Sequence, residues 1–454
     1  MCGFVGFYSK DVRDENVIKE MNNQIIHRGP DSDGYYFDNG INFGFRRLSI
    51  IDLHEGSQPI LNENNDIAII FNGEIYNYQE IKDDLLEKGY KFKTNTDTEV
   101  ILHGYEEYGE EGILEKLRGM FAFTIWDSKK ERLFGARDHF GIKPYYYSLI
   151  DGDFVFGSEI KSFLKYPKFK KEVNEKALKH YLVFQYNPLE ESFFKGVKKL
   201  RPGHYYIFEN GKLEIKSYYN LTLDYKEMSF DEAVSKIENE VEESVKYHKI
   251  SDVEVGSFLS GGVDSSYVVA TAMPNKTFSV GFDNKGFNET VYAKELSDRL
   301  GIENFSKIIT PDEFFDGINK VQYFSDEPHA NLSSVALYFL SKLASEQVKV
   351  VLSGEGADEL FAGYNEYAEA LPQRIYKKLK DKRHFSGKTI VMKYGQKVED
   401  RYIGPAEIMS DEQANLILKE KYRNSETSRD LTKKYYDEVK DMDDVSKRLY
   451  LDMK

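Results

Sequence analysis

Apolar and polar residues alternate in short runs through the first half of the chain, and this spacing predicts β-strands. The strands are expected at residues 4–8, 41–48, 66–71, 121–126 and 132–136, with a hairpin over 205–215 that turns at Glu209-Asn210-Gly211. The strand over 66–71 is expected to stop at Asn72. Helical spacing is predicted between the strands, over 15–26, around Ile81, Leu85 and Leu86, and over 100–108. Many short strands with a few helices predict a layered α+β domain.

The second half of the chain alternates regularly between strand and helix patterns. After a helix over 230–248, strands are expected at 253–259, 277–282, 305–309 and 348–352, and helices at 265–273, 289–300, 311–324 and 333–345. This alternation predicts an α/β domain with a parallel sheet covered by helices, whose ligands bind at the carboxyl ends of the strands. The loops at those ends are 260–266, 279–283 and 353–359.

At 454 residues the chain is too long for one ordinary core, so two domains are expected, at 2–217 and 229–454. No apolar run approaches the ~20 residues that span a bilayer, and the N-terminus lacks a signal pattern, which predicts a cytoplasmic protein without a membrane partner. The net charge of -15 argues against a nucleic-acid partner. The single cysteine excludes a disulfide within the chain.

That cysteine, Cys2, draws attention because of its position. Removal of Met1 would leave Cys2 with a free α-amine, whose ordinary pKa is roughly 8, and this amine could act as the base for its own thiol. The alternative is a small buried apolar residue near the chain end.

The run Leu259 to Ser266 contains two adjacent glycines and three serines, and it lies between a predicted strand and a predicted helix. Glycine amides, hydroxyl donors and a helix start together favour a phosphate-binding loop. The run lacks the lysine and the spacing of a Walker loop. The alternative is an ordinary capped turn between a strand and a helix.

Six motifs follow one another along the first half of the chain: MCGFVGF, HRGPDSDG, RRLSIID, NGEIYN, GMFAF and RDHFGIKPYYY. Together they resemble the glutamine amidotransferase domain of the N-terminal nucleophile class, over the first ~200 residues. The resemblance implies a helix–sheet–sheet–helix (αββα) fold and the hydrolysis of glutamine to glutamate and ammonia.

The same resemblance implies a role for each matching residue. Cys2 would be the nucleophile, with Asn72 and the amide of Gly73 forming the oxyanion hole. Arg47 would hold the glutamine α-carboxylate, and Glu74 and Asp97 its α-ammonium group. Backbone contacts would come from Leu48, Ser49, Ile50 and Ile51. The alternatives are a surface salt bridge for Arg47 and a helix N-cap for Asp97.

The motif LSGGVDSS, taken with SGEGADE over 353–359, is similar to the ATP-pyrophosphatase domain of asparagine synthetases. The resemblance implies that Leu259, Val280, Ser353 and Gly354 contact the adenosine part of ATP. It implies a pyrophosphate loop of Ser260, Gly261, Gly262, Asp264, Ser265 and Ser266. Asp264 and Asp358 would hold Mg²⁺, and Glu355 would assist the formation of an acyl-adenylate. The alternative for the acids at 355–359 is a favourable first helical turn.

Two further segments match less well. Asp326-Glu327-Pro328, with Asn331, Ser333 and Ser334, resembles the acceptor side of one branch of the family, although acids before proline are also ordinary turn chemistry. Relatives continue past this length with motifs, including a late lysine, that do not occur here. The fold of residues 375–454 is left open, apart from the stripe Tyr435, Val439, Met442, Val445, Leu449 and Met453, which predicts one amphipathic final helix whose exposed apolar face would favour self-association.

These observations favour glutamine-dependent amidation of a carboxylate. The leading hypothesis is the conversion of aspartate to asparagine through a β-aspartyl-AMP intermediate, with cleavage of ATP to AMP and diphosphate. Mg²⁺ would be the cofactor, and ammonia would cross a channel between the domains. The partners are then glutamine, aspartate and ATP, with a homodimer left open. The alternatives are a sugar acid or peptide carboxylate as acceptor, or a truncated protein with glutaminase activity only. Because the late lysine is missing, we expect slow glutamine hydrolysis and little amide product.

Overall fold

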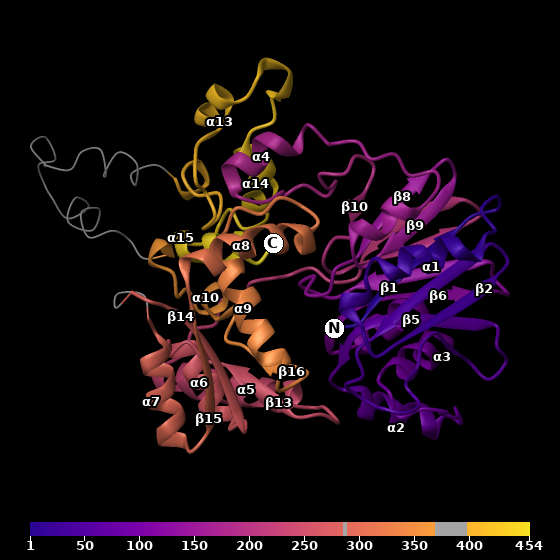
Figure 1. Cartoon of the computed structure of the whole chain (residues 1–454), viewed down its shortest axis with the longest axis horizontal. Helices are drawn as coiled ribbons and strands as arrows, with labels where there is room; N and C mark the ends of the chain where they lie inside the picture. Colours follow the sequence, from indigo (N-terminus) through magenta and orange to yellow (C-terminus); the bar gives the residue numbers. More distant parts are fainter. Residues whose placement is uncertain (285–287, 368–396) are drawn as a thin grey trace, which may run out of the picture.

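The computed structural model describes residues 1–284, 288–367 and 397–454. Figure 1 shows two bodies side by side, with the first domain in indigo and magenta on the right and the sheet of the second domain at the lower left. The C-terminal residues, in yellow, lie above the second domain and reach the first domain near α4 (Ala177–Phe184).

The first domain contains two six-stranded antiparallel sheets. The first sheet has the order β10-β8-β9-β1-β3-β2, with β1 Gly3–Tyr8, β2 Ser32–Asp38, β3 Ile41–Arg47, β8 Tyr146–Ile150, β9 Asp153–Gly157 and β10 Lys198–Lys199. The second has the order β12-β11-β7-β6-β5-β4, with β4 Ile60–Leu61, β5 Ile67–Ile75, β6 Gly119–Asp127, β7 Arg132–Arg137, β11 His204–Glu209 and β12 Lys212–Ser217.

A core of large apolar side chains, including Phe4, Phe43, Trp126 and Phe156, fills the space between these two sheets. The helix α1 (Glu15–Asn23) covers the outer face of the first sheet, and α2 (Tyr78–Glu87) and α3 (Thr98–Lys116) cover the outer face of the second. The layers therefore follow the order helix, sheet, sheet, helix, which confirms the αββα fold.

One boundary in this domain differs from the prediction. The strand expected to stop at Asn72 continues to Ile75, because Asn72, Gly73 and Glu74 pair with Ala122, Phe121 and Met120 of β6. Cross-strand pairing and burial here outweigh the low strand propensity of asparagine and glycine. Three residues assigned to the site therefore lie on a strand.

The second domain is built on a four-stranded parallel sheet with the order β15-β14-β13-β16, as predicted. Its strands are β13 Val255–Phe258, β14 Lys276–Phe282, β15 Glu303–Ile309 and β16 Val350–Leu352. Its helices are α5 Phe230–His248, α6 Val263–Ala272, α7 Thr290–Leu300, α8 Pro311–Ser325, α9 Ser333–Ser345 and α10 Ala357–Phe361.

Helices α5, α6 and α7 pack on one face of this sheet, and α8 and α9 pack on the other. The chain leaves β13 toward β14 on one side, whereas β16 joins on the other side. The carboxyl ends of β13 and β16 therefore lie at a topological switch point, where open α/β sheets bind ligands.

The prediction of one final helix from the apolar stripe is wrong. The structure has two helices instead, α14 (Ser428–Glu438) and α15 (Asp444–Asp452), because Asp443 caps the second by accepting from the amides of Val445 (2.9 Å) and Ser446 (3.1 Å). The stripe is also partly covered, since Val439 is buried and Tyr435 packs against the cluster of Val398, Tyr402, Tyr436 and Leu451. The helix α13 (Asp411–Ile417) packs on α4. Of the region 375–454, residues 375–396 lie outside the described part.

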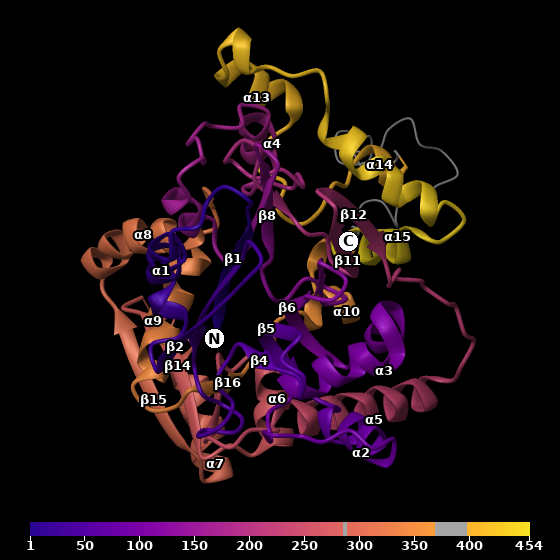
Figure 2. The ribbon, with the colours of Figure 1, turned by 90° about the vertical axis from the view of Figure 1, so that its right-hand side faces the viewer.

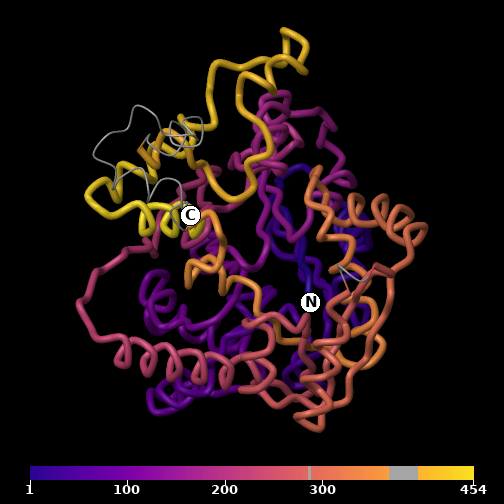
Figure 3. Tube along the Cα trace, turned by 90° about the vertical axis from the view of Figure 1, so that its left-hand side faces the viewer, coloured from indigo at the N-terminus to yellow at the C-terminus, as the bar shows by residue number. Residues whose placement is uncertain are grey.

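The two domains meet along several elements. Figure 2 shows α5 running beside α2 and below α3, where Arg118 pairs with Glu243 (2.9 Å) and Glu80 accepts from the hydroxyl of Tyr247 (3.1 Å). Figure 3 shows the segment between β12 and α5 running along the outside of the molecule. Among the described helices, none has the length and apolar character required to cross a bilayer.

Candidate active sites and the cavity between them

The first candidate site is a small pocket at one end of the two stacked sheets. Cys2 precedes β1, Arg47 ends β3, Gly73 and Glu74 belong to β5, and Asp97 precedes α3. Leu48, Ile50 and Ile51 also line this pocket, together with residues that we did not single out from the sequence: Gly56, Gln58, Phe71, Thr96 and Thr98. Of the expected glutamine-binding residues, Asn72 lines the neighbouring cavity instead, and Ser49 lines neither.

Arg47 holds the loop that follows β3. Its Nη2 atom donates to the carbonyl of Ile51 (3.3 Å) and to the carbonyl of Asp52. Among the described residues Arg47 makes no ion pair and it is buried, which argues against a surface salt bridge. A buried guanidinium without a carboxylate partner is suited to bind a substrate carboxylate.

Two buried acids face each other across the pocket. Asp97 accepts from the amide of Ile75 (2.8 Å) and from the hydroxyl of Thr96 (3.1 Å), and it makes no capping hydrogen bond to α3. Burial raises the pKa of Asp97 to about 6, and burial followed by the charge of Asp97 raises the pKa of Glu74 well above its ordinary value. Two carboxylates in this position would be stabilised by a bound cation such as an α-ammonium group.

The thiol of Cys2 lies beside the backbone of Leu48, whose amide donates to Sγ (3.4 Å). Burial raises the pKa of this thiol, so the thiol needs a base. Burial also lowers the pKa of the α-amine of Met1 to about 6, so this amine is unprotonated at neutral pH. If Met1 is removed, the corresponding amine belongs to Cys2 itself.

Asn72 and Arg28 hold the backbone of Cys2. In the orientation that satisfies its neighbours, the side-chain nitrogen of Asn72 donates to the carbonyl of Cys2 (3.0 Å), and its oxygen accepts from Nη2 of Arg28 (3.3 Å). Nε of Arg28 donates to the same carbonyl (2.9 Å). Gly73 allows close approach of β6, because a Cβ there would lie 2.2 Å from the carbonyl of Met120. Arg28 was missed by the sequence reasoning, although it lies within the HRGPDSDG motif.

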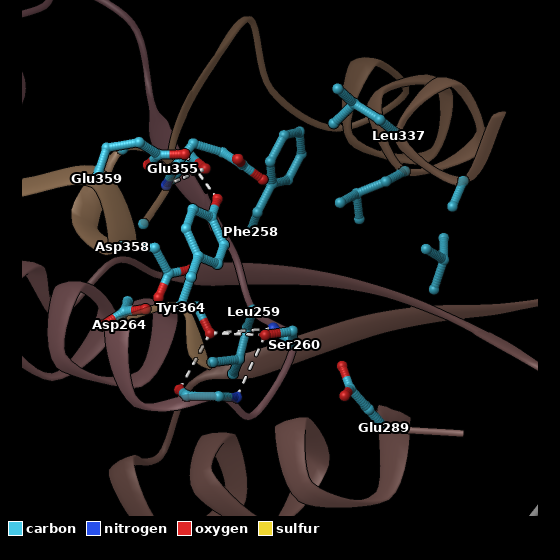
Figure 4. A pocket seen from close by; sticks show the side chains of 18 of the residues that line it. Phe258, Leu259, Ser260, Asp264, Glu289, Leu337, Glu355, Asp358, Glu359 and Tyr364 are labelled. Carbon is cyan, nitrogen blue, oxygen red and sulfur yellow. Dashed lines mark hydrogen bonds between the residues drawn. The ribbon is translucent and has the colours of Figure 1, made fainter. Parts of the chain in front are cut away.

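The second candidate site is a cavity of about 380 Å³ at the carboxyl ends of β13, β14 and β16 (Figure 4). Gly262 donates from its amide to the hydroxyl of Ser260 (3.2 Å), which lies 3.0 Å from the hydroxyl of Ser265. Gly261 has a φ of +90°, which favours glycine. A Cβ on Gly354 would lie 2.9 Å from the amide of Ser265, so the two predicted nucleotide loops touch.

Most residues assigned to ATP line this cavity. They are Leu259, Ser260, Gly262, Asp264, Ser265, Val280, Ser353 and Gly354, with Glu355 and Asp358. Gly261 and Ser266 are not among the lining residues: Gly261 faces Tyr292, and the amide of Ser266 donates to Gly262 within the start of α6 (3.0 Å). Phe258, Phe282, Glu289, Glu359 and Tyr364 also line the cavity and were not predicted; of these, Glu359 lies in the SGEGADE motif.

The residues assigned to Mg²⁺ fit that ion in their chemistry. Figure 4 shows Asp264 and Asp358 near each other on one side of the cavity. Loss of hydration and then the charges of Asp264 and Glu359 raise the pKa of Asp358. Two carboxylates beside a phosphate site are the ligands that Mg²⁺ commonly uses in proteins. A separate group, Glu63, His103 and Glu106, lies close enough to hold a metal but outside both pockets, and there His103 contacts Glu106 (2.9 Å).

A third cavity, of about 490 Å³, lies between the two sites. Cys2, Asn72, Gly73 and Glu74 line one end, and Val350, Val351 and Leu352 of β16 line the other. Phe258 lines both this cavity and the nucleotide cavity. Lys143 also lines it, and burial lowers the pKa of this lysine to about 8. Phe258 is therefore a lining residue that the two cavities share.

The segment expected on the acceptor side does not contribute to the nucleotide cavity. Asp326, Glu327, Asn331, Ser333 and Ser334 are absent from its lining, and the carboxylates of Asp326 and Glu327 are instead buried against the first domain. Turn chemistry and domain contacts explain these acids better than substrate binding does.

Comparison with known proteins agrees with this division of the chain. The model of a glutamine amidotransferase domain matches residues 1–219, and the model of asparagine synthase matches residues 236–454. The chain is 43% identical to glutamine-hydrolysing asparagine synthetase 1 of Bacillus subtilis, over 100% of this chain and 75% of that protein.

Two further relatives are more distant. Glutamine-hydrolysing asparagine synthetase 3 of Bacillus subtilis is 32% identical over 80% of this chain and 63% of that protein. The amidase chyE of Penicillium rubens is 31% identical over 81% of this chain and 60% of that protein. With both family models matched and 43% identity along its whole length, the chain belongs to the family of glutamine-hydrolysing asparagine synthetases.

Proposed function

We propose that this chain converts aspartate to asparagine, with glutamine as the nitrogen donor and with ATP cleaved to AMP and diphosphate. The first domain would release ammonia from glutamine, and the second would activate aspartate as β-aspartyl-AMP. The observation that carries this proposal is the cavity of about 490 Å³, which has the thiol of Cys2 at one end and meets the nucleotide cavity at Phe258.

In the first half-reaction, the α-amine of Cys2 takes the thiol proton and the thiolate attacks the side-chain amide carbon of glutamine. Asn72 and the amide of Gly73 stabilise the oxyanion, as donors of this kind typically do by a few kcal/mol each. The C–N bond breaks as the protonated amine returns its proton to the leaving ammonia. Water then hydrolyses the thioester to glutamate.

Substrate selection in this pocket rests on opposite charges at its two ends. Arg47 binds the α-carboxylate of glutamine, and Glu74 and Asp97 accept from its α-ammonium group. The lack of an ion pair for Arg47 among the described residues, and the raised pKa values of both acids, support these assignments.

In the second half-reaction, an oxygen of the aspartate β-carboxylate attacks the α-phosphorus of ATP and diphosphate leaves. The amide of Gly262 and the hydroxyls of Ser260 and Ser265 receive the phosphates, and Glu355 takes a proton when ammonia attacks the adenylate. Leu259 and Val280 line the adenosine side. Mg²⁺ bound by Asp264 and Asp358 would neutralise phosphate charge.

The cavity between the domains would carry ammonia from Cys2 to the adenylate. Its lining includes apolar side chains such as Ile142, Met120 and Leu352, which do not bind or protonate ammonia. Exclusion of bulk water keeps ammonia as the free base, since a protonated amine cannot attack the acyl-adenylate.

ATP–diphosphate exchange tests the acceptor. We expect aspartate to stimulate exchange more strongly than glutamate, a sugar acid or a short acidic peptide. Asparagine and AMP should then form together with glutamate when glutamine is added. Stronger stimulation of exchange by another carboxylate would identify that compound as the acceptor in place of aspartate. Glutamate release without any exchange would show that the chain acts as a glutaminase only.

A further inference from the structure

A buried chain of alternating charges connects the two domains behind the glutamine pocket. Nη1 of Arg28 lies 3.0 Å from Oε1 of Glu159, Glu159 pairs with Lys161, and Nζ of Lys161 lies 2.9 Å from Oδ1 of Asp326. The first three residues belong to the first domain, whereas Asp326 follows α8 of the second domain. Asp326 also accepts from the amide of Ile160 (2.6 Å).

The other end of this chain reaches the nucleophile. Arg28 donates from Nε to the carbonyl of Cys2, and from Nη2 to the side chain of Asn72. Arg28 therefore has its fixed anion, Glu159, on one side and the backbone of Cys2 on the other. Glu159 and the backbone of Cys2 therefore share Arg28 as a common partner.

The members of the chain are poorly hydrated, so their mutual attraction is strong. The side chains of Lys161 and Asp326 are 5% and 6% exposed, and that of Glu159 is 9% exposed. The ring of Phe324 packs on His27 at 4.7 Å and lies 6.0 Å from Nζ of Lys161. Removing one partner of a buried pair leaves an uncompensated charge, which its neighbours must move to satisfy.

The backbone at Asp326 indicates that this contact is enforced by its surroundings. Asp326 has a φ of +60°, in the region that favours glycine. A residue other than glycine holds such a conformation only where its surroundings impose it. Here the carboxylate is fixed by Lys161 and by the amide of Ile160.

We propose that Asp326 is a positioning residue for the glutaminase centre, acting from the second domain through Lys161, Glu159 and Arg28 on the carbonyl of Cys2. The inference rests on the proposed role of Cys2. Without the Asp326 carboxylate, Glu159 is the one anion that pairs with Lys161 in the described part of the chain, and Lys161 draws it away from Arg28. Arg28 then loses its anchor, and the thiol and Asn72 leave the geometry that the reaction needs.

The neighbouring acid, Glu327, provides a matched control. Its carboxylate is 11% exposed, pairs with Lys199 (2.9 Å), and accepts from Nδ2 of Asn187 (2.9 Å) and the amide of Phe193 (2.9 Å). Asp326 and Glu327 thus lie in one turn and each binds a lysine of the first domain. Only the lysine bound by Asp326 is connected to Cys2.

The experiment compares Asp326→Asn with Glu327→Gln in the full chain. Glutamate release is measured over a range of glutamine concentrations, alongside synthesis from added ammonia. We expect Asp326→Asn to lower the glutaminase kcat by about tenfold, on the scale of couplings between sites, with a small change in KM for glutamine. Synthesis from ammonia should stay near wild type, and Glu327→Gln should leave the glutaminase kcat within about twofold. Equal effects of the two variants would overturn the proposal.

A second pair of measurements separates positioning from folding. In Lys161→Met/Asp326→Leu the buried pair is replaced by apolar groups of similar size, a change that proteins commonly tolerate. We expect this folded variant to regain most of the glutaminase kcat and of the alkylation rate of Cys2 that Asp326→Asn loses, because no lysine remains to draw Glu159 away from Arg28. A kcat and an alkylation rate as low as those of Asp326→Asn would refute positioning by Asp326 through Lys161. Failure of the proposed function itself would appear separately, as glutaminase activity that survives Cys2→Ala.

Discussion

The glutamine pocket and the nucleotide cavity differ in how much of each site is complete before a substrate binds. In the glutamine pocket, Arg47, Asn72 and Asp97 are buried, and each already has protein partners that fix its side chain. In the nucleotide cavity, Ser260, Asp264 and Glu355 are exposed. The first site is therefore preorganised, whereas the polar side chains of the second are still open to solvent.

The difference follows from where each site lies in its sheet. Asn72, Gly73 and Glu74 are held within β5 by antiparallel pairing with β6, whereas the nucleotide loops begin where the parallel strands end. Strands position side chains more tightly than loops, and loops leave room for a large ligand. We expect changes in the first site to act on chemistry and changes in the second to act on ligand binding as well.

The largest effect should come from Cys2→Ala. Loss of the only thiol removes the nucleophile, so glutamate release should fall by at least about 10³-fold. Synthesis from added ammonia should continue, because the nucleotide cavity is untouched. The measurement is glutamate and asparagine formed with either nitrogen donor. Glutamate release near the wild-type rate would show that Cys2 is not the nucleophile of the glutamine pocket.

Asp264→Asn and Glu355→Gln should impair the reaction with ATP and spare glutamine hydrolysis. We expect aspartate-stimulated ATP–diphosphate exchange to fall by about 10²-fold, as is common when a charged or proton-transferring group is lost. Asp264→Asn should also weaken the dependence of exchange on Mg²⁺. Glutamine hydrolysis measured without ATP should stay near wild type. A selective loss of glutamine hydrolysis would show that the two sites are wrongly divided.

A smaller effect is expected at the junction of the two cavities. Phe258→Trp adds volume where the cavities meet, so asparagine formed per glutamate should fall by roughly threefold while each half-reaction measured alone changes less. The matched control is Phe282→Trp, which enlarges a residue that lines the nucleotide cavity but not the cavity beside Cys2. If the control lowers the ratio equally, Phe258 does not control passage.

The smallest effect concerns pH. Although burial opposes it, the nearby carboxylates of Glu106 and Glu99 raise the pKa of His103 to about 9. Because the folded pKa lies above the ordinary value of 6.5, this group contributes stability that is fully present below about pH 6.5 and lost as the pH rises through about 9. Glu99 also accepts from the amides of Lys93 and Thr94, on the loop before Asp97.

The test measures the Tm of the first domain between about pH 6 and about pH 10, the range in which His103 titrates. The glutaminase KM for glutamine is recorded in parallel. His103→Gln should flatten the fall in Tm toward alkaline pH, whereas His54→Gln, which removes an exposed imidazole, should not. A wild-type Tm that rises with pH over this range would contradict the sign of the shift.

The sequence predicted the layers of both domains and most of the residues that line the two sites, because ordered motifs carry residue identity together with position. It missed contacts that exist only after folding. Arg28 reaches Cys2 because β1 and the segment after α1 meet in space, and Phe258 joins two cavities only when α9 packs on β13. Asp326 resembled a residue of the acceptor side, with turn chemistry as the alternative, and its contact with Lys161 of the first domain could not be read from the sequence.

Two errors of element boundaries have local causes. Pairing with β6 extends β5 through Asn72, Gly73 and Glu74, and a propensity argument has no access to that partner. The break between α14 and α15 did have a signal, since Asp443 precedes Val445 and Ser446 at the spacing of an N-cap, but the apolar stripe outweighed it in the prediction.

The volume of the cavity between the domains also bears on local concentration. One ammonia molecule confined to about 490 Å³ corresponds to an effective molarity of roughly 3 M. Free ammonia in neutral solution would have to be present at a far higher total level to reach that value, because nearly all of it is protonated. If this cavity carries ammonia as proposed, each released nitrogen would react at a rate that depends little on the ammonium supply around the protein.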